Sequence, residues 1–65
     1  MPELFPELTH CTYVLYSQAD GDLYIGYSSN LQQRLLDHFN GKVASTAPRR
    51  PLRLIHVEYY LADED

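Results

Sequence analysis

Two apolar and aromatic runs separated by a short polar segment occupy the first half of the chain. The runs CTYVLYS (residues 11–17) and LYIGY (residues 23–27) are rich in β-branched and aromatic side chains, which favour strands. Between them, ADGD contains the Asp-Gly pair of tight hairpin turns, because glycine adopts a positive φ without steric cost. We therefore predict two antiparallel strands, Cys11–Ser17 and Leu23–Tyr27.

The hydrophobic pattern then changes to helical spacing. Ser29 is expected to cap the first turn, with Gln32 reaching back in a capping box. Asn40 and Gly41 are expected to end the helix, because glycine accepts the left-handed conformation that follows many helices. The apolar positions on one face of this helix are Leu31, Leu35, Leu36 and Phe39.

A loop and a third strand complete the predicted fold. Lys42–Pro51 contains two prolines and is expected to be a loop, and Leu52–Leu61 alternates imperfectly, as a strand does. The core candidates of this strand are Leu52, Leu54, Val57 and either Tyr59 or Tyr60. The order ββαβ predicts an α+β fold, a three-stranded antiparallel sheet with one helix packed on it. We assign residues 1–10 to an arm, 11–62 to the domain and 63–65 to the start of a further helix.

The distribution of charge matters more than its total. A net charge of -4 at first argues against a nucleic-acid partner, because phosphate binding depends on Lys and Arg. Five of the nine acidic residues lie in the terminal stretches 3–7 and 63–65, whereas residues 9–62 hold five basic residues and four acidic ones. A locally basic surface on an acidic protein can bind phosphate.

Cysteine content and hydropathy suggest a cellular location. The single cysteine, Cys11, excludes an internal disulfide and a zinc site of the usual Cys/His spacing, which fits a reducing compartment. No apolar run approaches the roughly 18 to 20 residues of a membrane span, and the first ten residues lack the features of a signal peptide. We predict a cytoplasmic protein without a membrane partner.

Residues able to act on a phosphate gather where the second strand meets the helix. Arg34 and His38 lie one turn apart on the flank of the helix, and the missing side chain of Gly26 is expected to let a ligand approach the helix start. Each of these residues also has an ordinary structural interpretation, such as a solvated helix arginine. Candidates for extending a phosphate-binding surface are Lys42, Arg49 and Arg50.

This ordered set of residues resembles the GIY-YIG nuclease family. Tyr24-Ile25-Gly26 matches the second half of the family's name, and Tyr13 in the first strand takes the place of the degenerate first half. Arg34 follows Tyr24 by ten residues, and His38 follows one turn later. The string NLQQRLLDHFNGK (residues 30–42), followed by RRP (residues 49–51), is closest to the small standalone, excision-nuclease-like members.

The resemblance implies a role for each matched residue. Tyr13 and Tyr24 would line the scissile phosphate, one of them as the base for the attacking water, with Tyr16 as a second choice for the first motif. Arg34 would neutralise the charge that develops on the phosphate, and His38 would contact the phosphate or assist the base. Backbone contacts at the helix start would come from Ser28, Ser29 and Asn30.

The resemblance also implies a metal ion whose ligand has no counterpart in this sequence. Family members hold Mg²⁺ or Mn²⁺ with a glutamate on a helix after the third strand, and Glu58 and Glu64 come too early to replace it. We therefore expect a DNA endonuclease domain that is inactive as this 65-residue chain. The expected substrate is branched, nicked or single-stranded DNA.

Two alternatives and one consequence remain. The chain could be a non-catalytic nucleic-acid or protein interaction module that keeps the fold, or an α+β domain whose resemblance to the family is accidental. Without the further helix, a sheet face would stay uncovered, and exposed apolar area of this kind favours self-association into a homo-oligomer.

Overall fold

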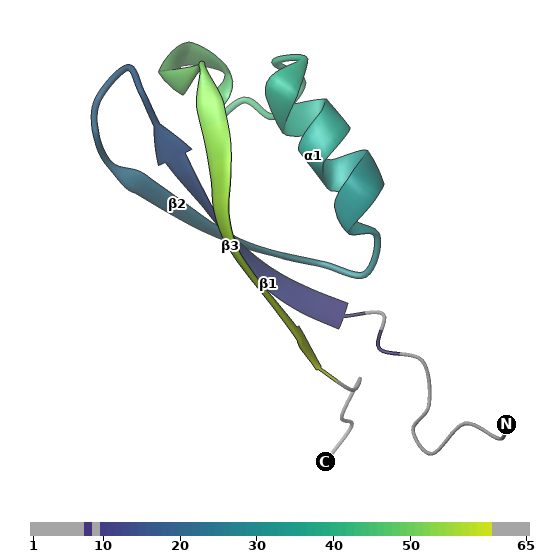
Figure 1. Cartoon of the computed structure of the whole chain (residues 1–65). Coiled ribbons are helices and arrows are strands. Elements are labelled where there is room, and N and C mark those ends of the chain that lie inside the picture. The colour runs from purple at the N-terminus through teal and green to yellow at the C-terminus, as the bar shows by residue number, and fades with distance from the viewer. Residues whose placement is uncertain (1–7, 9, 61–65) are drawn as a thin grey trace, which may run out of the picture.

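A three-stranded sheet and one helix make up the part of the chain that the computed structural model describes, residue 8 and residues 10–60 (Figure 1). The ββαβ order and the α+β class agree with the prediction. The strand β1 begins at the last residue of the predicted arm, and the rest of that arm, except residue 8, lies outside the described residues, as do residues 61–65. The elements are β1 (His10–Ser17), β2 (Leu23–Ser28), α1 (Leu31–Phe39), the 3-10 helix η1 (Ala47–Arg49) and β3 (Leu52–Tyr60).

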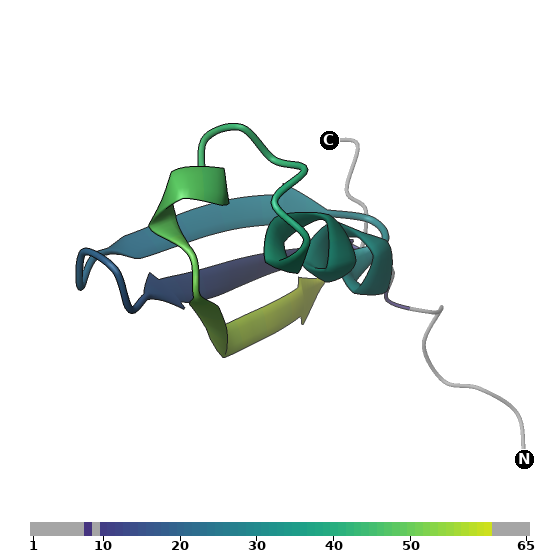
Figure 2. The ribbon, with the colours of Figure 1, turned by 90° about the horizontal axis from the view of Figure 1, so that it is seen from above.

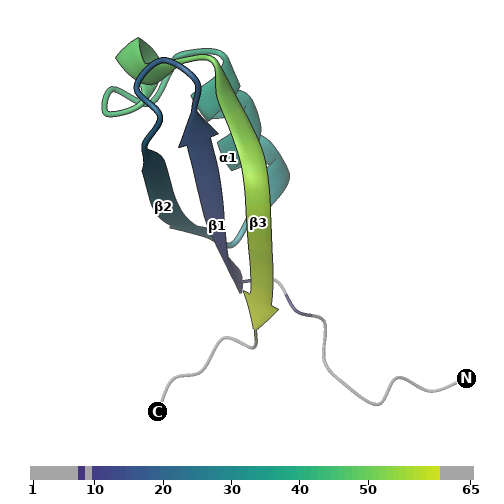
Figure 3. The ribbon, with the colours of Figure 1, turned by 60° about the vertical axis from the view of Figure 1, so that its left-hand side comes forward.

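The central strand of the sheet is β1. The strand order is β2-β1-β3, and both pairings are antiparallel. The helix α1 lies over one face of this sheet (Figure 2), and the three strands run side by side with α1 behind them in Figure 3. Tyr13 pairs with Gly26 of β2 and with Val57 of β3, so these three residues cross the middle of the sheet.

The turns are built largely as the sequence indicates, with one difference at the helix start. Gly21 in the hairpin and Gly41 after the helix have φ of 74° and 77°, the left-handed values expected of them. The predicted cap Ser29 is wrong, because Asn30 caps α1 through its side-chain oxygen, which accepts a hydrogen bond from the Gln33 N–H at 3.2 Å. The strand β2 continues through Ser28, and the helix therefore begins after Asn30.

The buried core is smaller than the hydrophobic pattern suggests. Its apolar members are Cys11, Tyr13, Leu15 and Leu52, and the half-buried residues packed against them are Tyr24, Leu31, Leu35 and Val57. Burial of Leu52 and Val57 confirms part of the predicted third-strand core. The predicted core positions that are instead exposed are Leu36, Phe39, Leu54, Tyr59 and Tyr60. A helix of nine residues is too short to cover the whole face of a nine-residue strand, so the ends of that face remain open.

The opposite sheet face carries apolar side chains without a covering helix among the described residues. On β2, Leu23, Ile25 and Tyr27 are 54%, 61% and 73% exposed. They alternate with Tyr24 and Gly26, which lie on the helix-covered face. None of the described helices has the length and apolarity that a membrane span requires.

Candidate active site

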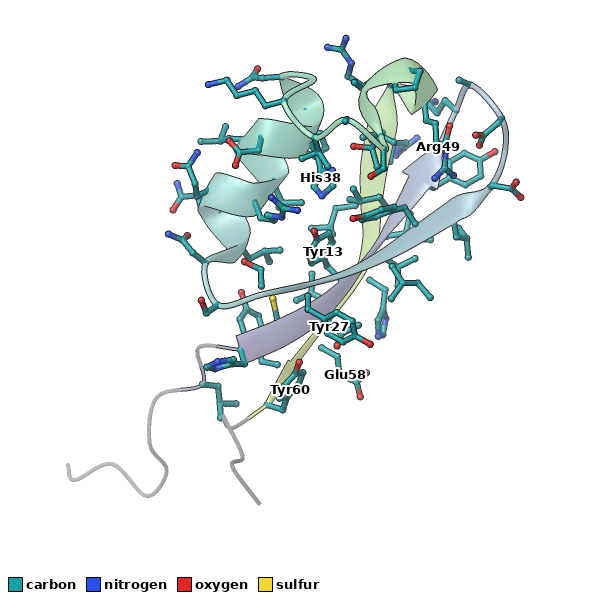
Figure 4. All side chains as sticks on the ribbon, turned by 180° about the vertical axis from the view of Figure 1, so that it is seen from behind. Tyr13, Tyr27, His38, Arg49, Glu58 and Tyr60 are labelled. Atoms are coloured by element: carbon teal, nitrogen blue, oxygen red, sulfur yellow. The ribbon has the colours of Figure 1, made fainter. Side chains whose placement is uncertain are left out.

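Three aromatic rings from three different elements meet beneath α1. Tyr13 comes from β1, Tyr24 from β2 and His38 from α1. The His38 ring is 5.1 Å from the Tyr24 ring and 5.6 Å from the Tyr13 ring between centroids, both in edge-on arrangements. Figure 4 shows the His38 side chain reaching from the helix toward Tyr13. The fold thus brings together three of the four predicted catalytic side chains, from positions up to 25 residues apart.

A chain of hydrogen bonds runs through the middle of this cluster. The Tyr13 hydroxyl is 2.8 Å from His38 Nε2, and His38 Nδ1 is 2.7 Å from Thr46 Oγ1. Tyr13, His38 and Thr46 are all fully buried. His38 therefore lies inside the molecule and not on the flank of the helix, because the loop after α1 folds Thr46 over its ring.

Gly26 provides the space that the Tyr13 ring occupies. A Cβ atom at Gly26 would lie 2.4 Å from both Cζ and the hydroxyl oxygen of Tyr13. Real Cβ atoms essentially never come so close to another heavy atom, so a side chain at this position would displace the ring. The missing side chain thus admits Tyr13, where the sequence suggested room for a ligand; contact of Gly26 with nucleic acid remains a prediction.

Arg34, the fourth predicted catalytic residue, acts on both members of the Tyr13–His38 pair. Burial raises the pKa of Tyr13, and a hydrogen bond from Arg34 partly opposes this rise. Burial lowers the pKa of His38, and the positive charge of Arg34 lowers it further, whereas Asp37 opposes the shift. Both side chains are therefore neutral near pH 7, so Tyr13 starts as a phenol and His38 as an imidazole.

The predicted phosphate-binding cations are partly engaged within the protein. Arg49 lies beside the hairpin turn (Figure 4), where its Nε donates to Asp20 at 2.7 Å and lowers the pKa of that carboxyl group to about 2. Arg50 Nε donates to the Ala47 carbonyl, and its guanidinium lies against Gly41. Lys42 is exposed, and it is its backbone N–H, not its ammonium group, that donates to the Asp37 carbonyl at the end of α1.

The predicted helix-start contacts are also used internally. The Ser28 hydroxyl accepts a hydrogen bond from the Asn30 N–H at 2.8 Å, and the Asn30 side chain caps the helix. These bonds fix the turn between β2 and α1, next to Gly26. Contact of Ser28, Ser29 or Asn30 with a phosphate remains a prediction.

Successive side chains of β1 point to alternate faces of the sheet. This places Tyr13 and Tyr16, the two tyrosines proposed for the first motif, on opposite faces. Tyr13 faces α1, whereas Tyr16 is exposed and pairs with Leu23 and Arg53. Side chains three positions apart on a strand point to opposite faces, so both cannot reach His38. Tyr13 is the one that lies beside it.

The described residues do not offer a metal site. They contain no group of three or more His, Cys, Asp or Glu side chains that could hold a metal ion. Glu58 is paired with Thr12, and therefore lies on the sheet face opposite to Tyr13, 3.8 Å from His56 (Figure 4). Glu64 lies outside the described residues. The residues in place thus do not fit a divalent cation beside Tyr13.

Thr46 is the member of the cluster that the sequence did not indicate. Thr46 lies in a loop next to Ser45. Thr46 is buried and Ser45 is exposed, but no periodic pattern in the sequence distinguishes the two hydroxyl groups. Proline at position 48 predicts a turn here, but not which side chain the turn sends inward.

Comparison with known proteins places these residues in context. A family model described as the GIY-YIG catalytic domain matches residues 9–65. A UPF0213 protein of Bacillus pumilus is 48% identical over 52 residues, which cover 78% of this chain and 52% of the relative. UPF0213 proteins of Staphylococcus epidermidis and Natronomonas pharaonis are 40% and 42% identical over 52 residues, covering 78% of this chain and 62% and 60% of the relatives. The chain therefore spans about half to three fifths of the length of these curated relatives, and no solved structure matches it.

Proposed function

Because this chain belongs to the GIY-YIG family, we propose that it forms the phosphate-activating part of an endonuclease domain that hydrolyses phosphodiester bonds of DNA. One contact supports this proposal most directly, the buried hydrogen bond between Tyr13 and His38. Arg34 adds a positive charge close enough to shift the pKa of both groups. A phenol hydrogen-bonded to an imidazole, with a guanidinium that influences both, can deprotonate a water molecule and neutralise the phosphate that it attacks.

The geometry suggests how the proton of the attacking water is removed. Tyr13 is a weak base while it keeps its own proton, and its raised pKa keeps that proton in place near pH 7. Tyr13 is fully buried, so the proposed step requires that DNA binding first opens a path for water to its hydroxyl. The water O–H bond then breaks and its proton passes to the Tyr13 oxygen. At the same time the Tyr13 proton passes to His38 Nε2, which is 2.8 Å away. The hydroxide oxygen forms a bond to phosphorus as the P–O bond to the departing part of the DNA strand breaks, and the departing oxygen takes up a proton from solvent.

Arg34 and Tyr24 complete the proposed site. The Arg34 guanidinium would donate hydrogen bonds to the oxygens on which negative charge grows, without transferring a proton. Tyr24 is half-buried with its ring against His38, and its hydroxyl is proposed to contact the phosphate. Candidates for contacts along the DNA backbone are Gly26, Ser28, Asn30, Lys42, Arg49 and Arg50.

GIY-YIG nucleases generally depend on a metal ion, and we propose Mg²⁺ or Mn²⁺ for this one. When bound, such an ion stabilises the negative charge on the leaving oxygen. The described residues do not fit this ion, so its ligand is proposed to come from outside them. The proposed substrate is branched, nicked or single-stranded DNA, and the proposed location is the cytoplasm, in keeping with the single buried thiol of Cys11.

Removal of Arg34 tests whether the cluster binds a phosphate. We expect Arg34→Ala to weaken binding of the 65-residue chain to branched or single-stranded DNA and to reduce the salt dependence by about one phosphate contact. Fluorescence anisotropy of labelled DNA at several salt concentrations measures both quantities. Arg53→Ala is the matched control, because Arg53 is paired with Tyr16 and lies on the opposite face. Equal losses in both variants would show that only net charge matters.

A non-catalytic binding module that keeps the fold is the second candidate. Nicking of supercoiled DNA separates the two functions. We expect no nicking by the 65-residue chain in Mg²⁺ or Mn²⁺, whereas the product of the gene's complete reading frame should nick under the endonuclease proposal. Binding without nicking by that complete product would favour the binding module.

The apolar sheet face opposite α1 supports a proposed homo-oligomer. Leu23, Ile25 and Tyr27 expose adjacent apolar surface on β2, and two copies that met there would remove it from water. Sedimentation velocity should show a species that dissociates on dilution. We expect Ile25→Lys to give a monomer at every concentration, because it places a charge in the proposed contact. A wild-type monomer whose sedimentation coefficient does not change with concentration would contradict the proposal.

A further inference from the structure

His38 has two ring nitrogens, and the structure gives each of them one hydroxyl partner. Nε2 meets the Tyr13 hydroxyl at 2.8 Å and Nδ1 meets the Thr46 hydroxyl at 2.7 Å. A neutral imidazole carries a proton on one nitrogen and a lone pair on the other, so one hydroxyl must donate to the ring and the other must accept from it. Both hydroxyls can do either. Which group donates in each of these two hydrogen bonds therefore depends on what else each hydroxyl oxygen contacts.

The surroundings of Tyr13 determine that direction. The hydrogen bond that the structure gives the Tyr13 hydroxyl is the one to His38 Nε2, at 2.8 Å. The Tyr13 hydroxyl is fully buried, so its own proton needs an acceptor within the protein. His38 Nε2 provides that acceptor, which means that Nε2 carries the lone pair and Nδ1 carries the proton.

The contacts of Thr46 agree with a hydrogen-bonded chain in which Tyr13 donates to His38 and His38 donates to Thr46. With the proton on Nδ1, the Thr46 oxygen accepts from His38 and its own O–H points to the Val43 carbonyl at 3.5 Å. In this direction the protons of Tyr13, His38 Nδ1 and Thr46 each have an acceptor. The opposite direction would make the Tyr13 oxygen an acceptor from His38 Nε2–H and leave the buried Tyr13 proton without an acceptor among the hydrogen bonds of the described residues.

The loop holds Thr46 in place independently of His38. The Thr46 N–H donates to the Val43 carbonyl at 3.0 Å, and the Thr46 carbonyl accepts from the Arg49 N–H at 2.9 Å. The Ala47 N–H also donates to Val43, at 2.8 Å. The backbone is thus tied on both sides of Thr46, so its hydroxyl is already in position when the histidine meets it.

We propose that Thr46 is a positioning residue, whose hydroxyl accepts the Nδ1 proton of His38 and thereby keeps the Nε2 lone pair on the Tyr13 hydroxyl. Without this acceptor, the histidine proton can move to Nε2, and His38 then cannot receive the Tyr13 proton. The tautomer follows from the hydrogen bonds alone. Its effect on catalysis rests on the proposed function.

The tautomer can be measured without any substrate. In ¹⁵N-labelled protein, at a pH where His38 is neutral, long-range ¹H–¹⁵N correlation spectra distinguish a protonated ring nitrogen from one with a lone pair, and His38→Gln identifies the signals. We expect protonated Nδ1 and unprotonated Nε2 in the wild type. Thr46→Val, which keeps the shape but removes the oxygen, should move the two nitrogen shifts toward each other, and Thr46→Ser should restore them. Protonated Nε2 in the wild type, or unchanged nitrogen shifts in Thr46→Val, would overturn the proposal.

Should Thr46→Val fail to fold, the wild-type spectrum and Thr46→Ser still decide the tautomer. In the complete gene product we expect Thr46→Val to lower DNA nicking by about tenfold to a hundredfold, as loss of a hydrogen bond that orients a functional histidine typically does, with DNA affinity retained. Thr46→Ser should keep most of the rate. The expected tautomer without nicking would contradict the endonuclease proposal alone. Nicking that is unaffected by Thr46→Val would contradict the catalytic part of the Thr46 proposal alone.

Discussion

Tyr13→Phe is expected to lower DNA nicking by the complete gene product by about 10²- to 10⁴-fold, the usual contribution of a positioned proton-transfer group. Phenylalanine fills the same space between Gly26 and His38 but has no oxygen to accept the water proton or pass one to Nε2. DNA affinity should change little, because the Arg34 guanidinium remains. A fall in kcat with KM retained is therefore the expected pattern in a plasmid-nicking time course.

Tyr16→Phe is the matched control for this experiment. It removes the same hydroxyl group from the same strand, but on the exposed face that carries Leu23 and Arg53. We expect its nicking rate to equal that of the wild type. If Tyr16→Phe abolished nicking and Tyr13→Phe did not, the first-motif tyrosine would be Tyr16, and the Tyr13–His38 contact would be structural.

Gly26→Ala should destabilise the fold by about 1–3 kcal/mol or more, the typical cost of overpacking a core. The new methyl group would lie 2.4 Å from the Tyr13 ring, which is fully buried and held by its hydrogen bond to His38. Gly26 is not among the glycines with positive φ, so the cost is steric and not conformational. Urea unfolding followed by circular dichroism should show a lower midpoint with an unchanged slope.

Introducing Gly26→Ala into a Tyr13→Leu protein shows whether the Tyr13 ring causes this loss of stability. Tyr13→Leu removes the ring carbon and the oxygen that the methyl group would meet. Gly26→Ala should therefore cost much less when introduced into Tyr13→Leu than into the wild type, which a double-mutant cycle measures as a coupling energy. Equal costs in the two backgrounds would mean that Gly26 is needed for another reason.

The local elements could be predicted because local patterns specify them. The Asp-Gly pair fixes the hairpin turn, the run of β-branched and aromatic residues gives the strands, and Gly41 ends the helix. The helix start was placed one residue early, since Ser29 and Asn30 are both good caps and only the length of β2 chooses between them. Exposure of Leu54, Tyr59 and Tyr60 could not be foreseen either, because it depends on how far α1 extends over the sheet.

The secondary structure and the motifs that carry the family resemblance can be found in the sequence alone, and the resemblance then implies Tyr13, Tyr24, Arg34 and His38 as the candidate catalytic residues. The strands, the turns, the helix and the motifs can be recognised in this way because each depends on residue types at fixed spacings along the chain. Three features arise only when the chain has folded: His38 is buried, Gly26 makes room for Tyr13, and Thr46 is the third member of the hydrogen-bonded chain. These depend on contacts between β1, β2, α1 and the following loop. The direction of a hydrogen bond, and the space for a ring, exist only once those segments have packed together.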